Sequence, residues 1–273
     1  MEVCIKEDSV ELGKAAGKVA AELLKKAIEK NGQVNIILAT GVSQFETLKQ
    51  LISEKGIDWS KVVMFHLDEY IGLSESSPAS FRKYLKERFV EKLPALKACH
   101  FIDGETDPLA ECERLSDIIQ KHPIDVALVG IGENGHLAFN DPPADFATEK
   151  PFIIVNLEER CRKQQFNEGW FEAVDDVPLQ AITMSIQQIC KSQYIVCSVP
   201  ESRKAEAVKN CLEQPISNLY PGSILQSHPN CTYFLDKDSA AYLLMDQSHN
   251  GNGTEGVYNK SFLAEERDVN GEW

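Results

Sequence analysis

Apolar residues follow two alternating patterns along the chain, which are short continuous runs and longer stretches with helical spacing. The runs predict buried strands, at residues 34–39, 62–67, 99–102, 124–130, 152–155, 181–185, 194–198 and 231–235. The spaced stretches predict helices between them, at residues 9–31, 48–52, 81–89, 109–119, 201–212 and 239–244, with a polar helical stretch that leads to Phe171. Because strand, loop and helix keep alternating, we predict an α/β fold with a doubly wound, mostly parallel sheet and helices on both faces, a modified Rossmann-like arrangement.

The same pattern sets the domain organisation. No linker rich in Gly, Pro or Ser interrupts residues 1–245, so this span is predicted to form a single domain. From residue 246 to residue 273 the chain is polar, carries several glycines and has few large apolar side chains. We expect this segment to be a polar C-terminal tail.

Composition and charge narrow the range of partners. The hydrophobic content of 43% and charged content of 26% are those of an ordinary globular protein. The net charge of −14 disfavours binding to nucleic acid or to an anionic membrane, both of which need clustered basic residues. An anionic ligand would therefore need a locally positive pocket.

The cysteines and the first residues predict the compartment. The eight cysteines form no CxxC pair, and the start of the chain has neither a basic segment nor an apolar segment of a secretory signal. No apolar run approaches the roughly 20 residues that span a bilayer. We expect reduced thiols and a cytoplasmic protein.

A polar loop follows the apolar run that ends at Gly130. It gathers five polar side chains within nine residues, which are Glu133, Asn134, His136, Asn140 and Asp141. Open α/β sheets bind ligands beyond the carboxyl ends of their strands, so this loop is expected to be an active site. His136 is best suited to move protons near neutral pH, and Asp141, Glu133 or Asn134 could fix its tautomer.

Two adjacent carboxylates, Asp68 and Glu69, follow a second apolar run. A partly buried carboxylate at a strand end is suited to abstract a proton beside a carbonyl, because burial raises its pKa. The same pair could instead supply the negative charge that a helix N-terminus favours. The spacing alone favours this second interpretation.

Two further stretches are candidates for phosphate binding. The first, between a strand and a helix, comprises Thr40, Gly41, Val42, Ser43 and Gln44. Backbone N–H groups at the helix N-terminus and the hydroxyls of Thr40 and Ser43 could hold a phosphate, although a plain turn capped by Ser43 explains the residues equally well. The second is Lys204, at the start of a later helix, for which a solvated helix face is the simpler interpretation on the residues alone.

Taken together, these stretches resemble the glucosamine-6-phosphate isomerase/deaminase family, a sibling of the 6-phosphogluconolactonases. The resemblance covers about residues 1–245. Its specific motifs are FHLDEYIGL at residues 65–73 and GIGENGHLAFND at residues 130–141. The weaker ones are the loop at Thr40-Gly41, residues 183–185 and the helix that carries Lys204.

The resemblance implies a cytoplasmic hydrolase of amino-sugar metabolism that needs neither cofactor nor metal. It would convert glucosamine 6-phosphate, or a close hexosamine 6-phosphate, to a ketose 6-phosphate and ammonia by ring opening and enolisation. Asp68 would carry a proton between C2 and C1, and His136, held by its acidic neighbours, would assist ring opening. Residues 40–44 and Lys204 would hold the phosphate. The expected partner is then the phosphorylated amino sugar. Family members are often oligomeric, so the resemblance also allows a homo-oligomer.

Three positions depart from the family pattern. Asn134 stands where family members carry aspartate, Asp141 where they carry glutamate, and Gln165 where they place a phosphate-binding arginine. Arg160, Arg162 or Lys163 could replace that arginine, or the chain could prefer another sugar phosphate. If ring opening is limited by the missing carboxylate, Asn134→Asp is expected to raise activity.

Two other functions stay open at this point. A 6-phosphogluconolactonase-type hydrolase shares the fold, but its Gly-His loop typically continues Ala-Ser-Leu-Phe-Pro, whereas this chain continues Leu-Ala-Phe-Asn-Asp-Pro. A non-catalytic sugar-phosphate sensor would keep the phosphate site and lack turnover.

Overall fold

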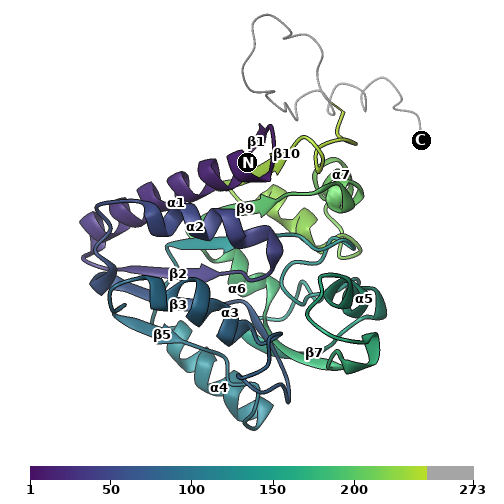
Figure 1. Cartoon of the computed structure of the whole chain (residues 1–273), viewed down its shortest axis with the longest axis horizontal. Helices are drawn as coiled ribbons and strands as arrows, with labels where there is room; N and C mark the ends of the chain where they lie inside the picture. The colour runs from purple at the N-terminus through teal and green to yellow at the C-terminus, as the bar shows by residue number, and fades with distance from the viewer. Residues whose placement is uncertain (245–273) are drawn as a thin grey trace, which may run out of the picture.

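The main sheet of the computed structural model is wholly parallel and confirms the predicted fold class (Figure 1). The structure describes residues 1–244, so the tail predicted at residues 246–273 lies outside the described residues. The strand order is β1-β10-β9-β6-β2-β3-β5. The strands are β1 (Glu2–Lys6), β2 (Val34–Leu38), β3 (Val62–His66), β5 (Ala98–His100), β6 (Val126–Val129), β9 (Tyr194–Val199) and β10 (Cys231–Asp236).

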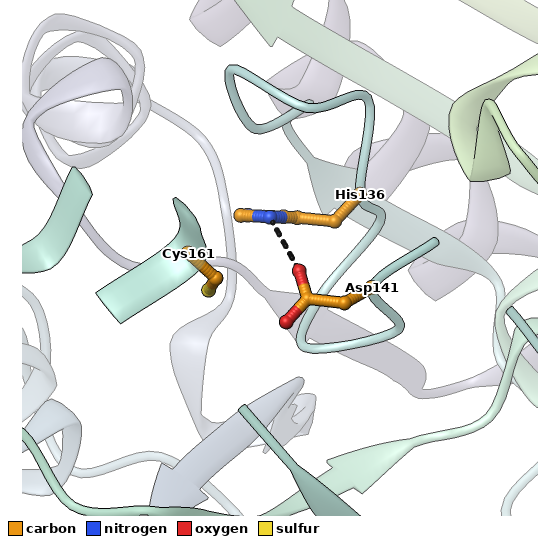
Figure 2. A group of neighbouring side chains, drawn as sticks. All are labelled: His136, Asp141 and Cys161. Carbon is orange, nitrogen blue, oxygen red and sulfur yellow. Dashed lines mark ion pairs between the residues drawn. The ribbon is translucent and has the colours of Figure 1, made fainter. Parts of the chain in front are cut away.

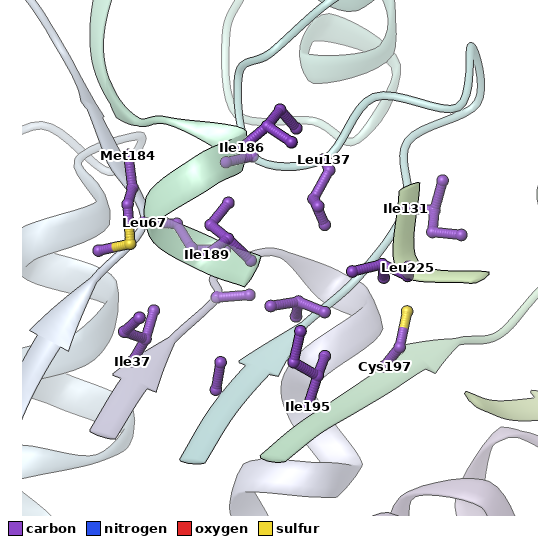
Figure 3. Packing of buried hydrophobic residues seen from close by; sticks show 14 of the residues in the cluster. Ile37, Leu67, Ile131, Leu137, Met184, Ile186, Ile189, Ile195, Cys197 and Leu225 are labelled. Atoms are coloured by element: carbon purple, nitrogen blue, oxygen red, sulfur yellow. The ribbon is translucent and has the colours of Figure 1, made fainter. Parts of the chain in front are cut away.

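Helices cover both faces of this sheet, because its central strands are apolar on both sides. Ile36 and Leu38 of β2 pack into a cluster with the helices α1 and α2, whereas Ile37 packs into a second cluster on the opposite face. Figure 3 shows that second cluster, in which Ile186 and Ile189 of α6 lie over the strands that carry Ile37 and Ile195. The helices are α1 (Ser9–Asn31), α2 (Phe45–Ser53), α3 (Phe81–Arg88), α4 (Pro108–Ile119), α5 (Glu159–Asn167), α6 (Ile186–Cys190) and α7 (Ala205–Glu213).

A second, smaller sheet departs from the prediction of one continuous sheet. It is antiparallel, in the order β4-β8-β7, and its strands are β4 (Asp68–Tyr70), β7 (Phe152–Asn156) and β8 (Gln180–Met184). The chain leaves the main sheet after β3, and the carbonyl of Leu67 then accepts a hydrogen bond from the N–H of Met184 (2.7 Å). In this way Asp68 comes to lie opposite Thr183 of β8.

The chain ends of the described region also differ from the prediction. Strand β1 was not predicted, because its five residues are polar or half-exposed and gain their structure by pairing with β10. Residues 239–244 form turns where a helix was predicted. The carboxylate of Asp236 accepts a hydrogen bond from the N–H of Ser239 (2.7 Å), which closes an Asx-type turn directly after β10.

Helix caps follow the expected chemistry. Asp8 caps α1, and its carboxylate accepts from the N–H of Glu11 (2.8 Å). Gly32 ends the same helix in the left-handed conformation with φ 75°. Within residues 1–244, no helix has the length and apolar character needed to cross a bilayer.

Candidate active site

One cavity collects most of the predicted site residues. It lies at the carboxyl ends of β2, β6 and β9, beside the start of the small sheet. Its polar lining consists of Thr40, Ser43, Asp68, His136, Gln164, Gln165, Glu168, Arg203 and Lys204, with backbone from residues 39–43 and 130–132. Five segments that are far apart in the sequence, at residues 39–43, 67–68, 130–139, 164–168 and 203–204, therefore meet in one hollow, as expected for the carboxyl edge of a parallel sheet.

Asp68 lies in the wall of this cavity at the first position of β4. Its side chain is buried, with 6% of the residue exposed. Burial, and next the charge of Glu69, raise the pKa of Asp68 well above the usual aspartate value, while the backbone N–H of Phe139 opposes the shift. A buried carboxylate with a raised pKa at a cavity wall is suited to take up and return a proton.

Glu69 has a different role from its neighbour. It does not line the cavity and is fully buried. Its carboxylate accepts hydrogen bonds at the N-terminus of α3, from Ser80 Oγ (2.9 Å), Phe81 N (3.2 Å) and Arg82 N (2.9 Å). Asp68 thus lines the cavity, whereas Glu69 supplies the negative charge at a helix N-terminus.

His136 lines the same cavity, and Asp141 lies behind it. His136 Nδ1 is 3.1 Å from Asp141 Oδ1. Figure 2 shows that the carboxylate approaches from outside the plane of the ring, so the contact is not an aligned hydrogen bond, and it becomes an ion pair when the imidazole is protonated. Burial by itself would raise the pKa of Asp141, but the contacts with His136 and then Asn134 outweigh it and lower that pKa. Asp141 therefore stays ionised beside the imidazole.

Asn134 holds this pair in place. Its Nδ2 donates to Asp141 Oδ1 (3.0 Å) and to Glu158 Oε2 (3.2 Å), and its Oδ1 accepts from the backbone N–H of His136 (3.0 Å). Neither Asn134 nor Asp141 lines the cavity. Both are positioning residues for His136 rather than groups that face a ligand, which sharpens the sequence prediction for the two positions.

Cys161 of α5 is a neighbour of this pair that the sequence analysis did not single out (Figure 2). Nitrogen, oxygen and sulfur atoms of His136, Asp141 and Cys161 lie within 4.8 Å of one another. Burial, and next the Asp141 carboxylate, raise the pKa of the thiol well above its usual value, so it stays protonated.

The loop after β2 also lines the cavity. Gly41 has φ 92°, a backbone conformation that a side chain would strain, and η1 (Val42–Gln44) leads directly into α2. Gln44 was predicted to help hold a phosphate, but it does not line the cavity. Its Nε2 donates to the carbonyls of Val129 and Ser198, each at 3.4 Å, and so ties the loop to β6 and β9.

Lys204 and Arg203 close the cavity at η5 (Ser202–Lys204). Lys204 is 3% exposed, and burial lowers its pKa to about 8. Within the described residues, no carboxylate lies at ion-pair distance from its Nζ. Arg203 is paired instead, since its Nη1 lies 3.0 Å from Glu133 and 3.1 Å from Glu168, and its Nε lies 2.5 Å from Glu201.

The three predicted replacements for the missing arginine do not reach the cavity. Arg160 is exposed and lines a separate surface hollow. Arg162 donates to the carbonyls of Val174 and Val177, and Lys163 pairs with Glu159 on the surface. That expectation was wrong because the polar face of α5 that carries these residues points away from the site. The residues of α5 and its C-terminal end that do line the cavity are Gln164, Gln165 and Glu168.

Comparison with known proteins points to one family. A family model described as glucosamine-6-phosphate isomerases/6-phosphogluconolactonase matches residues 7–234. The chain is 35% identical over 246 residues to a glucosamine-6-phosphate deaminase of Lactobacillus delbrueckii subsp. bulgaricus. The aligned region covers 89% of this chain and all of that protein. A deaminase of the same name from Listeria monocytogenes is 37% identical over 84% of this chain and 96% of its own length.

Solved structures show the same fold. A monomeric glucosamine-6-phosphate deaminase superposes with a TM-score of 0.80 at 31% identity, over 89% of this chain and all of that chain. A 6-phosphogluconolactonase from Trypanosoma brucei superposes with a TM-score of 0.72 over 89% of this chain and 98% of that chain, but is 16% identical and so shows the fold alone.

Proposed function

The chain belongs to the glucosamine-6-phosphate isomerase/6-phosphogluconolactonase family, and on that premise we propose that it is an enzyme that converts glucosamine 6-phosphate to fructose 6-phosphate and ammonia. The observation that carries the proposal is a single cavity in which Asp68, His136 and the free Lys204 meet the loop at residues 40–43. A base, a proton-exchanging imidazole and an anion-binding loop are the parts that this reaction needs.

Asp68 is the base of the isomerisation. In the open-chain sugar, its carboxylate takes the proton from C2, which leaves an enolamine, and returns that proton to C1. The resulting imine at C2 then reacts with water, and the 2-amino group leaves as ammonia, so that sugar phosphate and water give ketose phosphate and ammonia. The raised pKa of Asp68 suits both halves of the transfer, because the group must first accept and then release a proton.

His136 assists the preceding ring opening. It exchanges a proton between the anomeric hydroxyl and the ring oxygen, as an imidazole can near neutral pH. The ionised Asp141 beside it stabilises the imidazolium that forms when the ring takes up a proton. Asn134 keeps that carboxylate in position through its hydrogen bond.

The phosphate is held on the other side of the cavity. Thr40, Gly41, Val42 and Ser43 supply backbone N–H groups and hydroxyls at the start of η1 and α2, and Lys204 supplies a positive charge. Gln44 supports this loop from behind.

A substrate panel tests the proposal. Purified protein is given glucosamine 6-phosphate, galactosamine 6-phosphate and 6-phosphogluconolactone, and ammonia, ketose phosphate and free acid are followed. Ammonia is expected from glucosamine 6-phosphate. Ammonia from neither amino sugar would refute the deaminase, hydrolysis of the lactone would support the lactonase instead, and binding without turnover would indicate a sensor.

Asp68→Asn tests the assignment of the base. We expect turnover to fall by about a hundredfold to ten-thousandfold, because the amide cannot accept the proton. Binding of inorganic phosphate should stay close to wild type, since the substitution is on the other side of the cavity. Asp117→Asn, an exposed position on α4, is the matched control. Intact turnover in Asp68→Asn would exclude Asp68 as the base.

We further propose that residues 1–245 form a single domain and that the protein is cytoplasmic. Seven cysteines form no disulfide within residues 1–244, namely Cys99, Cys112, Cys161, Cys190, Cys197, Cys211 and Cys231. Burial raises the pKa of most of those inside the protein, for example Cys211 to about 12, which keeps the thiols protonated and unreactive. Such thiols agree with a reducing compartment.

A further inference from the structure

Arg203 is a cation of the cavity wall that the family resemblance does not explain. Its guanidinium offers donors on three nitrogens, of which Nε and Nη1 are engaged by carboxylates. The third nitrogen, Nη2, has no hydrogen-bond partner among residues 1–244. Since Arg203 lines the same cavity as Lys204, a donor of fixed positive charge is available next to the lysine.

The carboxylates around Arg203 outnumber it. Glu133, Glu168 and Glu201 all pair with this one guanidinium, and they come from the polar loop, the C-terminal end of α5 and the start of η5. The side chain of Glu168 is 7% exposed, and Glu168 itself lines the cavity. An anionic ligand that enters the cavity therefore has to compete with the Glu168 carboxylate, which already pairs with Nη1 of Arg203.

The other groups on this side cannot neutralise a phosphate dianion. Gln165, which stands at the position of the family's arginine, accepts a hydrogen bond from Tyr70 Oη on its Oε1 (3.0 Å) and presents a neutral amide. Gln164 is engaged as well, because its Oε1 accepts from Glu133 N and its Nε2 donates to Glu168 Oε1. Lys204 supplies one charge, so a second cation has to come from Arg203.

We propose that Arg203 is the second phosphate-binding cation of this cavity and that Glu168 holds its guanidinium until a phosphate takes its place. In this exchange the phosphate displaces Glu168 from Nη1 and uses Nη2 for a two-pronged contact, while Glu133 keeps its place on Nη1. The proposal rests on the proposed function only in requiring a ligand with a phosphate group.

The test uses inorganic phosphate as the probe, with its dissociation constant measured by calorimetry, together with KM and kcat for glucosamine 6-phosphate. Arg203→Gln is expected to weaken phosphate binding and raise KM by about ten- to a hundredfold, the range for a lost charge-assisted hydrogen bond, with kcat within about threefold. Arg203→Lys keeps the positive charge but lacks the two-pronged donor geometry of the guanidinium, so its phosphate affinity and KM should lie between those of wild type and Arg203→Gln. Arg160→Gln, an exposed arginine of α5 outside the cavity, is the matched control.

Glu168→Gln tests the exchange itself. Removal of the competing charge should leave Arg203 available, so inorganic phosphate should bind several-fold more tightly than in wild type. Phosphate binding weakened as much as in Arg203→Gln would overturn the exchange and make Glu168 a support for the arginine. Melting temperatures of all variants separate these results from loss of folding.

Two further outcomes decide the proposal as a whole. If Arg203→Gln and Arg203→Lys keep the wild-type phosphate affinity and KM and lose only thermal stability, Arg203 is a structural ion pair and the proposal fails. If wild type releases no ammonia from any sugar but binds phosphate in an Arg203-dependent way, the proposed function fails and the phosphate site stands.

Discussion

The sequence predicts that replacement of Asn134 by aspartate raises activity, and the structure predicts the opposite. The sequence alone suggested that a carboxylate at this position would help His136. In the structure, Asn134 Nδ2 is the donor between two carboxylates, at 3.0 Å from Asp141 and 3.2 Å from Glu158. Asn134→Asp removes that donor and places a third negative charge against the other two.

The cost of this repulsion follows from the distances between position 134 and the two carboxylates. At 3.0 and 3.2 Å and an effective dielectric constant of about 20, each like-charge contact costs about 5 kcal/mol. Glu158 is exposed, so solvent screens its share, whereas Asp141 is half-buried and is not screened to the same degree. The new carboxyl group therefore takes up a proton, and its pKa lies well above the usual aspartate value in the folded protein.

The sign of the pH dependence is then fixed. A protonated carboxyl can donate one hydrogen bond in place of the amide, so the variant resembles wild type at low pH. Because its pKa is higher in the folded than in the unfolded state, this stability is complete below the unfolded pKa and is lost as pH rises through the folded pKa. Asn134→Asp should thus become less stable and less active relative to wild type toward alkaline pH.

The assay is a pair of profiles for wild type and variant, kcat/KM with glucosamine 6-phosphate and the melting temperature, from about pH 5 to about pH 8.5, on either side of neutrality. We expect at least a tenfold loss of kcat/KM at the alkaline end and a melting temperature lower by several degrees, at about 2–4 °C per kcal/mol. A variant that is as stable as wild type and more active across the range would refute the argument.

Two other predictions concern the reacting groups. Because burial raises the pKa of Asp68, the acid limb of kcat/KM should lie above the usual aspartate pKa of about 3.9, with activity rising as the carboxylate ionises, and a limb at the ordinary value would contradict the assigned base. Gly132→Ala would place a Cβ 2.2 Å from Cε1 and Nε2 of His136, so the ring must shift and kcat should fall about a hundredfold with phosphate affinity kept. The control Gly32→Ala, whose Cβ meets nothing within 4 Å, should lose stability alone, and equal kcat in both variants would exclude a tight fit around His136.

The main sheet could be predicted from sequence because its strands are buried on both faces. Ile36, Ile37 and Leu38 form a continuous apolar run, and each face of the sheet receives part of it. Strand β4 carries no such signal, since it is three residues long and two of them are acidic. Its conformation is set by pairing with β8, which lies far along the chain, and local patterns do not report such pairing.

The same limit applies to the two carboxylates at the start of β4. Successive side chains of a strand point to opposite sides, so Asp68 and Glu69 cannot both face the cavity. The sequence offers a base and a helix-capping charge as alternatives for the pair and contains nothing that assigns one to each residue. The assignment follows from the position of α3, whose N-terminal N–H groups lie on the side of Glu69.

The phosphate side of the cavity shows why the charge of a site cannot be read from the chain. A net charge of −14 predicts that an anionic ligand needs a local positive region. The folded cavity supplies Lys204 and Arg203, but it also brings Glu133, Glu168 and Glu201 to the arginine. Phosphate affinity then depends on how much better a phosphate binds the guanidinium than Glu168 does. For that reason, removing one cavity anion should strengthen binding, an effect that a count of cations would not predict.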